Sequence, residues 1–297
     1  MPILAKCARV AMRALPVQRR ALHQLPPIPA TIEEGCDPFL SKRTTALLWN
    51  QLQGGLLKRL NEEVRGTPHA TESVVETVVN TARDRSKVLA FSYASLALNH
   101  SFFLSGLIPG ITQAHPEFPQ PSPDSDARFF GKTLATAIAD QYGSLPQLKL
   151  AFSSAAMGMF SGGYVWLVKD EHGRLGIVPT YGTGTVLVQQ RQQRGPSDLV
   201  AAVQDGSGEG AAPPEGAQAD SRPGLAQGTP TSRFDSLAHG SAAGAIGNNL
   251  YPLLCVSVFE HAWLGDYGLW GKERYLQRFW DAVNWTRAEQ LWGADRV

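Results

Sequence analysis

Residues 162–181 read GGYVWLVKDEHGRLGIVPTY, and this stretch contains two short runs of β-branched and aromatic residues. Residues 164–169 form the first run, residues 175–181 form the second, and the turn-forming residues Asp170 and Gly173 lie between them. Such a pattern is typical of a β-hairpin. A third β-rich run follows at residues 251–259, so the sequence predicts a small three-stranded antiparallel sheet.

Two helical segments precede this sheet. In residues 38–61, leucines recur every four residues at positions 48, 52, 56 and 60, which predicts a helix with one apolar face. Residues 72–107 form a second, more apolar candidate that stops at the helix-breaking sequence Ile108-Pro109-Gly110. Two long helices in succession can pack as a hairpin, and we assign residues 33–115 to this unit.

The remaining helical segments surround the predicted sheet. A helical pattern over residues 126–155 is interrupted at Tyr142-Gly143-Ser144, where Ser144 is positioned to cap a new helix. A last helix is predicted at residues 272–283. This order of elements predicts an α+β fold, in which an N-terminal helical hairpin is followed by a C-terminal domain over residues 126–297.

A low-complexity insert separates the second and third predicted strands. Residues 195–249 contain 10 Gly, 11 Ala, 5 Pro and 6 Ser in a stretch of 55 residues. These residue types provide little apolar surface to bury, so we expect the insert to be disordered. The alternative is a segment that becomes ordered against a partner.

The first 32 residues contain neither Asp nor Glu, and their basic residues lie among apolar ones: Lys6, Arg9, Arg13, Arg19 and Arg20. This composition resembles that of a mitochondrial transit peptide. We therefore expect a targeting segment at residues 1–32 and a location in the mitochondrial matrix. The alternative is a basic arm that stays on the mature protein and contacts RNA.

The overall composition excludes several classes of protein. The 27 Lys and Arg residues nearly balance the 26 Asp and Glu residues, so any RNA contact is expected to be local. The three cysteines, at positions 7, 36 and 255, show no CxxC spacing, which indicates a reducing compartment. No run approaches the ~18–20 consecutive apolar residues of a membrane-spanning helix, so we expect no membrane span. The motifs GxSxG and HExxH and a phosphate-binding glycine loop are absent from the sequence.

Several segments together resemble the iron/manganese superoxide dismutases. The similarity covers this family's second-helix segment, the segment that leads into its first strand, its Glu-His signature and its last helix. The corresponding residues are Asn99-His100-Ser101-Phe102-Phe103, 142–149, 161–167, 260–263, Tyr275, Trp280 and Asn284-Trp285. The resemblance implies an N-terminal helical hairpin and a C-terminal α+β domain that hold Fe or Mn between them with three histidines and one aspartate.

Only two of the four ligands implied by this resemblance are retained. The family's second-helix histidine corresponds to His100 and its last ligand histidine to His261, whereas its first-helix histidine falls on Leu48 and its aspartate on Ser257. We therefore expect no metal, no cofactor and no catalytic residue. Asp266 follows His261 instead of preceding it, so we expect Asp266 to be a surface or turn residue and not a replacement ligand.

The positions around the implied metal site also carry mostly apolar residues where the resembled family has polar ones. The family's active-site tyrosine and a neighbouring histidine fall on Leu56 and Leu52, and its glutamine falls on Leu96 or Thr183. Leu48, Leu52 and Leu56 are spaced to share one helix face. We expect this face to be buried, at roughly 1.5–3 kcal/mol per fully buried leucine. The site is thus predicted to be filled with apolar core.

The Glu260-His261 pair resembles a contact by which two chains of this family associate across a two-fold axis. The resemblance implies a dimer interface formed by Glu260, His261 and Trp263, with Tyr267 as a further aromatic anchor. The alternative is a pair of residues at a helix start without any partner. The other aromatic residues of this region are expected to be core or interface anchors: Trp270, Trp280, Trp285 and Trp292.

The mitochondrial address and the altered ligand positions most resemble the dismutase-like proteins of the fungal mitochondrial ribosomal small subunit. That resemblance implies a structural, non-enzymatic role in mitochondrial translation. It also implies a second dismutase-like chain as the partner in a pseudo-symmetric heterodimer, or a second copy of this chain. Other small-subunit proteins and limited local rRNA contact complete the expected partners. The alternative is an active mitochondrial Fe/Mn superoxide dismutase with an altered ligand set.

Overall fold

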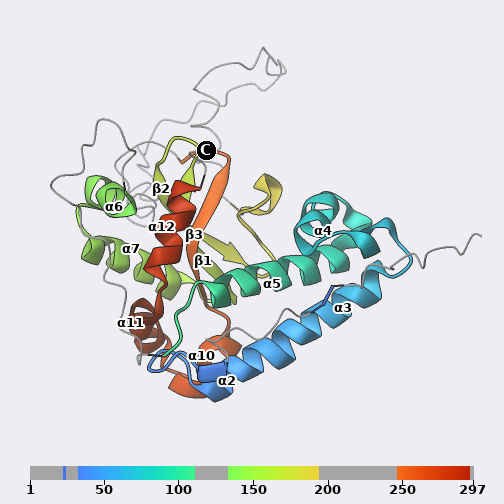
Figure 1. The fold of residues 1–297 in the computed structure, drawn as a ribbon, viewed down its shortest axis with the longest axis horizontal. Helices are drawn as coiled ribbons and strands as arrows, with labels where there is room; N and C mark the ends of the chain where they lie inside the picture. The colour runs from blue at the N-terminus through green and yellow to red at the C-terminus, as the bar shows by residue number, and fades with distance from the viewer. Residues whose placement is uncertain (1–22, 25–32, 111–132, 194–245, 295–297) are drawn as a thin grey trace, which may run out of the picture.

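The computed structural model describes residues 23–24, 33–110, 133–193 and 246–294 (Figure 1). A long helical hairpin lies beside a domain in which helices surround a three-stranded sheet. This arrangement confirms the predicted α+β fold, with the hairpin first and the sheet second. The expected targeting segment, apart from His23 and Gln24, and residues 195–245 of the expected insert lie outside the described residues.

The first arm of the hairpin is a continuous run of helical segments. It consists of α2 (Lys42–Ala46), the π-helical segment η1 (Leu47–Gln53) and α3 (Gly54–Val64). Ser41 caps the run, because its Oγ accepts a hydrogen bond from the backbone N of Thr44 at 3.2 Å. The helix predicted at residues 38–61 is therefore confirmed, with both ends moved by a few residues. The π-helical turns are not visible in the spacing of the leucines.

The second arm consists of two helices, and the single helix predicted at residues 72–107 is wrong. After the short 3₁₀ helix η2 (Pro68–Thr71), α4 (Val74–Thr81) and α5 (Val88–Ser105) are separated by a bend that contains η3 (Arg85–Lys87). Asp84 accepts hydrogen bonds from the backbone N and the Oγ of Ser86 at 2.8 and 2.7 Å. Local bonds of this kind compete with helix continuation, which explains the break.

Helix α5 qualifies the expectation that the chain lacks a membrane span. Arg85–Ser105 is a 21-residue helical stretch with the length and apolar composition of a spanning helix. Half of its most apolar window is buried within the chain, and α5 packs against α3, α4 and the strand β3 (Leu250–Ser257). The core helix of a folded domain meets the same criteria of length and composition, and α5 occupies such a position.

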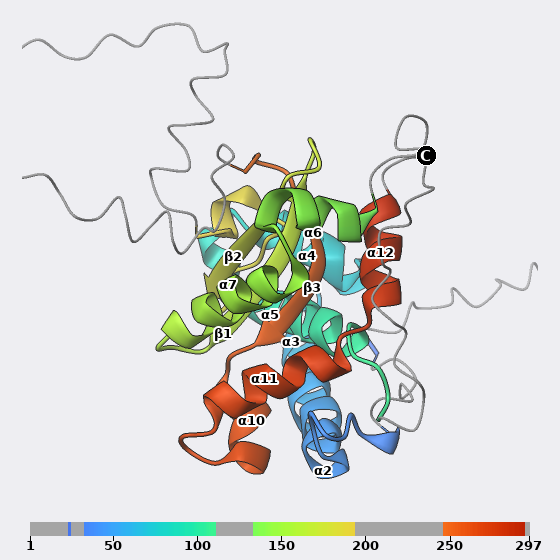
Figure 2. The same cartoon turned by 90° about the vertical axis from the view of Figure 1, so that its left-hand side faces the viewer.

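The sheet has the predicted topology. Strand β1 (Gly163–Asp170) lies between β2 (Leu175–Tyr181) and β3, and it is antiparallel to both. All eight residues of β1 are buried. Helices α6 (Leu134–Tyr142) and α7 (Leu145–Gly158) cover one face of the sheet, and α5 lies behind the other (Figure 2). Ser144 caps α7 as predicted, since its Oγ accepts a hydrogen bond from the backbone N of Gln147 at 3.4 Å.

The C-terminal region contributes α10 (Glu260–Tyr267), α11 (Lys272–Ala282) and α12 (Trp285–Gly293). The sequence predicts only α11 of these three. Trp280, Trp285 and Trp292 are buried, as expected for core residues, whereas Trp270 is 96% exposed between α10 and α11. The expectation of a core or interface role for this row of aromatic residues is therefore confirmed for the three buried tryptophans only.

One continuous core joins the sheet to the near end of the hairpin. Leu48 and Phe103 of the hairpin belong to the same buried cluster as Trp166 of β1 and Phe279 of α11. The far end of the hairpin has a smaller cluster of its own, which includes Leu60, Val64, Val78 and Phe91. The boundary between hairpin and domain is thus part of the main core, and the candidate site lies at this boundary.

The predicted insert ends earlier than residue 249. Residues 246–249 are described, and the backbone N of Gly247 donates to Asp170 Oδ2 at 2.9 Å. The carbonyl oxygen of Asn248 accepts from Gln192 Nε2 at 3.1 Å. Backbone groups make these bonds, so amino-acid composition gives no sign that these four residues belong to the folded domain.

Asp266 is exposed, as predicted for a surface or turn residue, and it also holds the C-terminal domain to the hairpin. Its Oδ1 accepts hydrogen bonds from Ser41 Oγ at 2.7 Å and from Thr44 Oγ1 at 2.9 Å, and its Oδ2 accepts from the backbone N of Ser41 at 2.8 Å. The carboxylate therefore lies at the N-terminus of α2. Backbone N–H groups lack helical partners there, and the helix dipole favours negative charge.

We expect Asp266→Ala to lower the free energy of unfolding by about 1–2 kcal/mol, because it removes hydrogen bonds to a charged group and a favourable charge at the start of a helix. Urea denaturation followed by circular dichroism measures the change. Asp281→Ala is the matched control, because the Asp281 carboxylate is also solvent-exposed and pairs with Arg278 at 3.5 Å; its loss should cost less than about 0.5 kcal/mol. Equal losses for the two variants would contradict the role of Asp266 in joining the C-terminal domain to the start of α2.

Candidate functional site

The candidate site lies where the hairpin meets the C-terminal domain. His100 belongs to α5, Leu48 to η1, Ser257 is the last residue of β3, and His261 lies in the first turn of α10. These are the four positions at which the resemblance to dismutases implies metal ligands. Their side chains decide what this junction can do chemically.

His100 is fully buried and bonds to the backbone of the first arm. Its Nε2 lies 3.2 Å from the carbonyl oxygen of Leu48. A carbonyl oxygen can only accept, so Nε2 carries the proton and Nδ1 is the unprotonated nitrogen. Burial, and secondarily the nearby His261, lowers the pKa of His100 to about 3. The ring is therefore neutral at physiological pH, and its Nε2 is occupied by a hydrogen bond within the protein.

Leu48 places an aliphatic side chain at the first implied ligand position. It is fully buried in the main core, and Leu56 is buried in a separate small cluster with Leu57. Leu52 is only partly buried. Leu52 nevertheless packs against both of these clusters. The predicted shared face is therefore present, with Leu48 and Leu56 buried and Leu52 partly buried.

Ser257 offers no carboxylate at the second altered position. Its side chain is fully buried, and its Oγ has no hydrogen-bond partner among the described residues. Its carbonyl oxygen accepts a hydrogen bond from the hydroxyl of Tyr275 at 2.9 Å. The residue thus joins β3 to α11 through its backbone, and its hydroxyl cannot supply the negative charge of an aspartate.

His261 lies closer to the surface than His100. Its ring stacks on Phe259 with centroids 5.0 Å apart and planes inclined by 17°. Burial lowers the pKa of His261, and the neighbouring Glu260 carboxylate opposes this shift. Within the part of the chain that the structure describes, no group of three or more His, Cys, Asp or Glu residues is placed to hold a metal ion. The residues at the site do not fit an Fe or Mn centre with three histidines and one aspartate.

Polar residues to which the sequence analysis assigned no contact join α5 to its surroundings. Ser95 Oγ donates to the carbonyl oxygen of Thr183 at 2.8 Å, and Asn99 Nδ2 donates to that of Gly184 at 2.8 Å. Gln53 Nε2 donates to the carbonyl oxygen of Ala97 at 3.1 Å. Ser95 and Asn99 are polar residues in a mostly apolar helix. This contrast is the feature of the sequence that could have predicted their hydrogen bonds. All three side chains bind backbone and position no substrate.

The residues expected at a dimer interface divide into two groups. Glu260 and His261 are exposed at the start of α10, whereas Trp263 is 7% exposed and belongs to the main core. Tyr267 is partly buried, and its hydroxyl donates to the carbonyl oxygens of Phe39 and Pro38. On a short helix, residues two apart point in different directions. Trp263 therefore supports the fold, whereas Glu260 and His261 are part of the exposed surface of α10.

The fold and this site together define a dismutase-like protein with an altered metal-ligand set. Residues 131–197 and 232–291 match the family described as iron/manganese superoxide dismutases, C-terminal domain. This part of the chain is similar to that family.

The similarity to relatives extends over most of the chain. Over 270 residues, the chain is 26% identical to small ribosomal subunit protein mS42 of Schizosaccharomyces pombe, covering 90% of this chain and 94% of that protein. It is 25% identical over 268 residues to small ribosomal subunit protein mS43 of the same organism, with 89% and 82% covered. It is also 25% identical over 262 residues to the Fe superoxide dismutase of Salmonella typhimurium, with 88% and 94% covered.

The buried His100 makes the stability of the protein depend on pH. The unfolded chain binds a proton on this histidine near its ordinary pKa of 6.5, while the folded chain resists protonation until about pH 3. Stability from His100 is thus complete above pH 6.5 and is lost as the pH falls from 6.5 towards 3, by up to about 1.4 kcal/mol per pH unit.

We expect His100→Gln to flatten this acid-side slope, as measured by urea denaturation between pH 7 and pH 4. His172→Gln is the control, because the side chain of His172 is 67% exposed in the β1–β2 turn. The control should retain the wild-type slope. An unchanged slope in His100→Gln would show that the pH dependence arises elsewhere.

Proposed function

We propose that this chain is a structural component of the mitochondrial ribosomal small subunit and a catalytically inactive member of the dismutase family. The observation that carries the proposal is the contact between His100 Nε2 and the Leu48 carbonyl oxygen in an otherwise apolar junction. Sequence identity does not decide between scaffold and enzyme, since it is 26%, 25% and 25% to the two ribosomal proteins and the Fe dismutase. The chemistry of the ligand positions therefore decides.

The mitochondrial matrix is the proposed location. The basic, acid-free composition of residues 1–32 supports a targeting segment. A ribosomal role in mitochondrial translation requires the same compartment. The near-neutral charge of the chain favours contacts to proteins, with rRNA contact limited to local groups of basic residues.

The proposed partner is a second dismutase-like chain in a pseudo-symmetric pair. Two small-subunit proteins of one organism are similar to this chain over nearly the same length, which supports a pair of chains with a common fold. Glu260 and His261 are exposed at the start of α10 and are available for such a contact. Pairing with a second copy of this chain is the alternative.

The second candidate function is an active mitochondrial superoxide dismutase with an altered ligand set. The retention of His100 and His261 and the similarity to an Fe dismutase over 88% of this chain favour it. Two imidazoles, one of which bonds to a backbone carbonyl, leave most of the coordination sphere without protein ligands. An active dismutase would therefore need metal ligands from outside this site, whereas a scaffold needs none.

We expect the purified protein to lack dismutase activity and to contain far less than one Fe or Mn per chain. The double variant Leu48→His, Ser257→Asp restores the family's ligand types, but it should not recover full activity, because Leu52, Leu56 and Leu96 leave the surroundings apolar. Elemental analysis and a superoxide dismutation assay are the measurements. About one Fe or Mn per chain in the wild-type protein would refute the scaffold proposal.

We expect the tagged chain to sediment with the small ribosomal subunit in a gradient of lysed mitochondria. Glu260→Ala should weaken pairing with the second dismutase-like chain, since removal of one member of a buried polar contact costs about 1–3 kcal/mol. It should change no enzymatic rate. Glu171→Ala, in the β1–β2 turn, is the control and should retain the partner. Wild-type chain that stays at the top of the gradient would contradict the ribosomal role.

A further inference from the structure

His23 bonds to the helical hairpin, although it belongs to the segment expected to direct the chain to mitochondria. Its carbonyl oxygen accepts a hydrogen bond from Nδ2 of Asn61, near the end of α3, at 2.8 Å. This end of α3 lies away from the sheet (Figure 1). The two residues are 38 positions apart. A bond between residues so distant in the chain belongs to the tertiary structure, so His23 is part of the folded protein.

The side chain of His23 also packs against the hairpin. Its Nε2 is buried. Burial lowers the pKa of this imidazole, and the Glu72 carboxylate opposes the shift, which places Glu72 near the ring. Glu72 Oε2 lies 2.8 Å from Nδ1 of His69 in η2, and Glu72 Oε1 accepts from Nδ2 of Asn80 in α4 at 2.9 Å. His23 therefore lies against a polar cluster that joins two elements of the hairpin.

The side chain of Asn61 depends on His23 for its hydrogen bonding. Asn61 is partly buried, and its Oδ1 has no partner among the residues that the structure describes. The bond from its Nδ2 to His23 is the one hydrogen bond of this side chain within the same residues. A buried donor without an acceptor destabilises a fold. The hairpin is therefore more stable when residue 23 is present.

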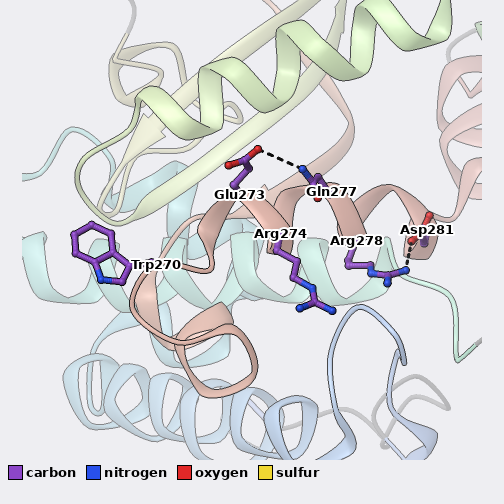
Figure 3. A pocket seen from close by; sticks show the side chains of 6 residues that line it. All are labelled: Trp270, Glu273, Arg274, Gln277, Arg278 and Asp281. Atoms are coloured by element: carbon purple, nitrogen blue, oxygen red, sulfur yellow. Dashed lines mark hydrogen bonds and ion pairs between the residues drawn. The ribbon is translucent and has the colours of Figure 1, made fainter.

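This long-range contact differs from the polar contacts in the groove along α11. In that groove, Gln277 donates to Glu273 at 3.3 Å, and Arg278 pairs with Asp281 at 3.5 Å (Figure 3). Each partner lies about one turn away on the same helix, so these contacts can form wherever the helix forms. The contact of Asn61 requires in addition that the chain still contains residue 23.

The basic composition of the N-terminal segment ends before His23. Its five Lys and Arg residues lie at positions 6, 9, 13, 19 and 20, and residues 21–32 contain neither Lys nor Arg. Basic residues interspersed among apolar ones are the feature typical of a mitochondrial transit peptide. The targeting character of the sequence thus stops at position 20, and the described tertiary contacts begin at position 23.

We propose that the targeting segment is cleaved no later than the peptide bond between Leu22 and His23, so that the mature protein retains His23. This inference rests on the proposed mitochondrial location, and it shortens the targeting segment from residues 1–32 to residues 1–22 at most. Cleavage is a hydrolysis by a peptidase of the organelle. One water adds across one peptide bond, which leaves a carboxylate on the released peptide and an α-amino group on the mature chain.

The first test determines the N-terminus of the full chain, tagged at its C-terminus, after purification from mitochondria. Labelling of α-amino groups before digestion and mass spectrometry identify the first residue. We expect it at position 23 or earlier, with a peptide removed. A mature chain that begins at Gln24 or later overturns the inference alone, as does a chain in mitochondria that is not cleaved. A chain absent from mitochondria refutes the proposed location.

The second test measures the contact of Asn61 in the purified mature chain. Asn61→Ala should lower the midpoint of thermal unfolding by about 2–4 °C relative to Asn50→Ala, because it removes one hydrogen bond. Asn50→Ala is the matched control, since Asn50 is exposed on the same arm and undergoes the same change of helix propensity. In a chain shortened to begin at Leu25, the two variants should have equal midpoints, because the partner of Asn61 is already lost. The same difference in both lengths of chain overturns the inference.

Discussion

The hydrogen bond from His100 to the carbonyl oxygen of Leu48 determines how the two parts of the molecule meet. It joins α5 to the π-helical turn of the first arm at the centre of the main core. A ring nitrogen can carry a proton for donation or offer its lone pair to a metal, but it cannot do both. Because Nε2 donates to this carbonyl oxygen, its lone pair is not available to a metal, while Nδ1 is buried and has no hydrogen-bond partner among the described residues.

The polar residues around this contact have the same role. Ser95, Asn99 and Gln53 each bond to a backbone carbonyl oxygen of another segment. Ser257 bonds to α11 through its carbonyl oxygen. Residues that could have formed a reactive site thus connect helix to loop and strand to helix. The groups left available for interaction lie on the surface, such as Glu260 and His261 at the start of α10.

Local signals explain which elements could be predicted. The β1–β2 hairpin follows from β-favouring runs with a turn between them, and β2 matches its predicted range residue for residue. The break between α4 and α5 depends on one side chain, Asp84, and the apolar composition of the segment concealed it. Helix α10 was overlooked because its N-cap residue, Phe259, makes no side-chain capping bond. Asn284 does cap α12, so the start of that helix was readable from the sequence.

The sequence by itself determined the fold class from residue type and local spacing, and it gave the residue types at the four positions that the resemblance to dismutases matches with metal ligands. Leucine and serine cannot ligate as histidine and aspartate do, whatever their surroundings. Only the tertiary structure decided that Asp266 bonds to Ser41, the N-cap of α2, since the two residues are 225 positions apart. It likewise decided that Trp263 is buried and Trp270 exposed. Those outcomes depend on how α10 and the turn that follows it lie against the core, and that placement is set by contacts between distant segments.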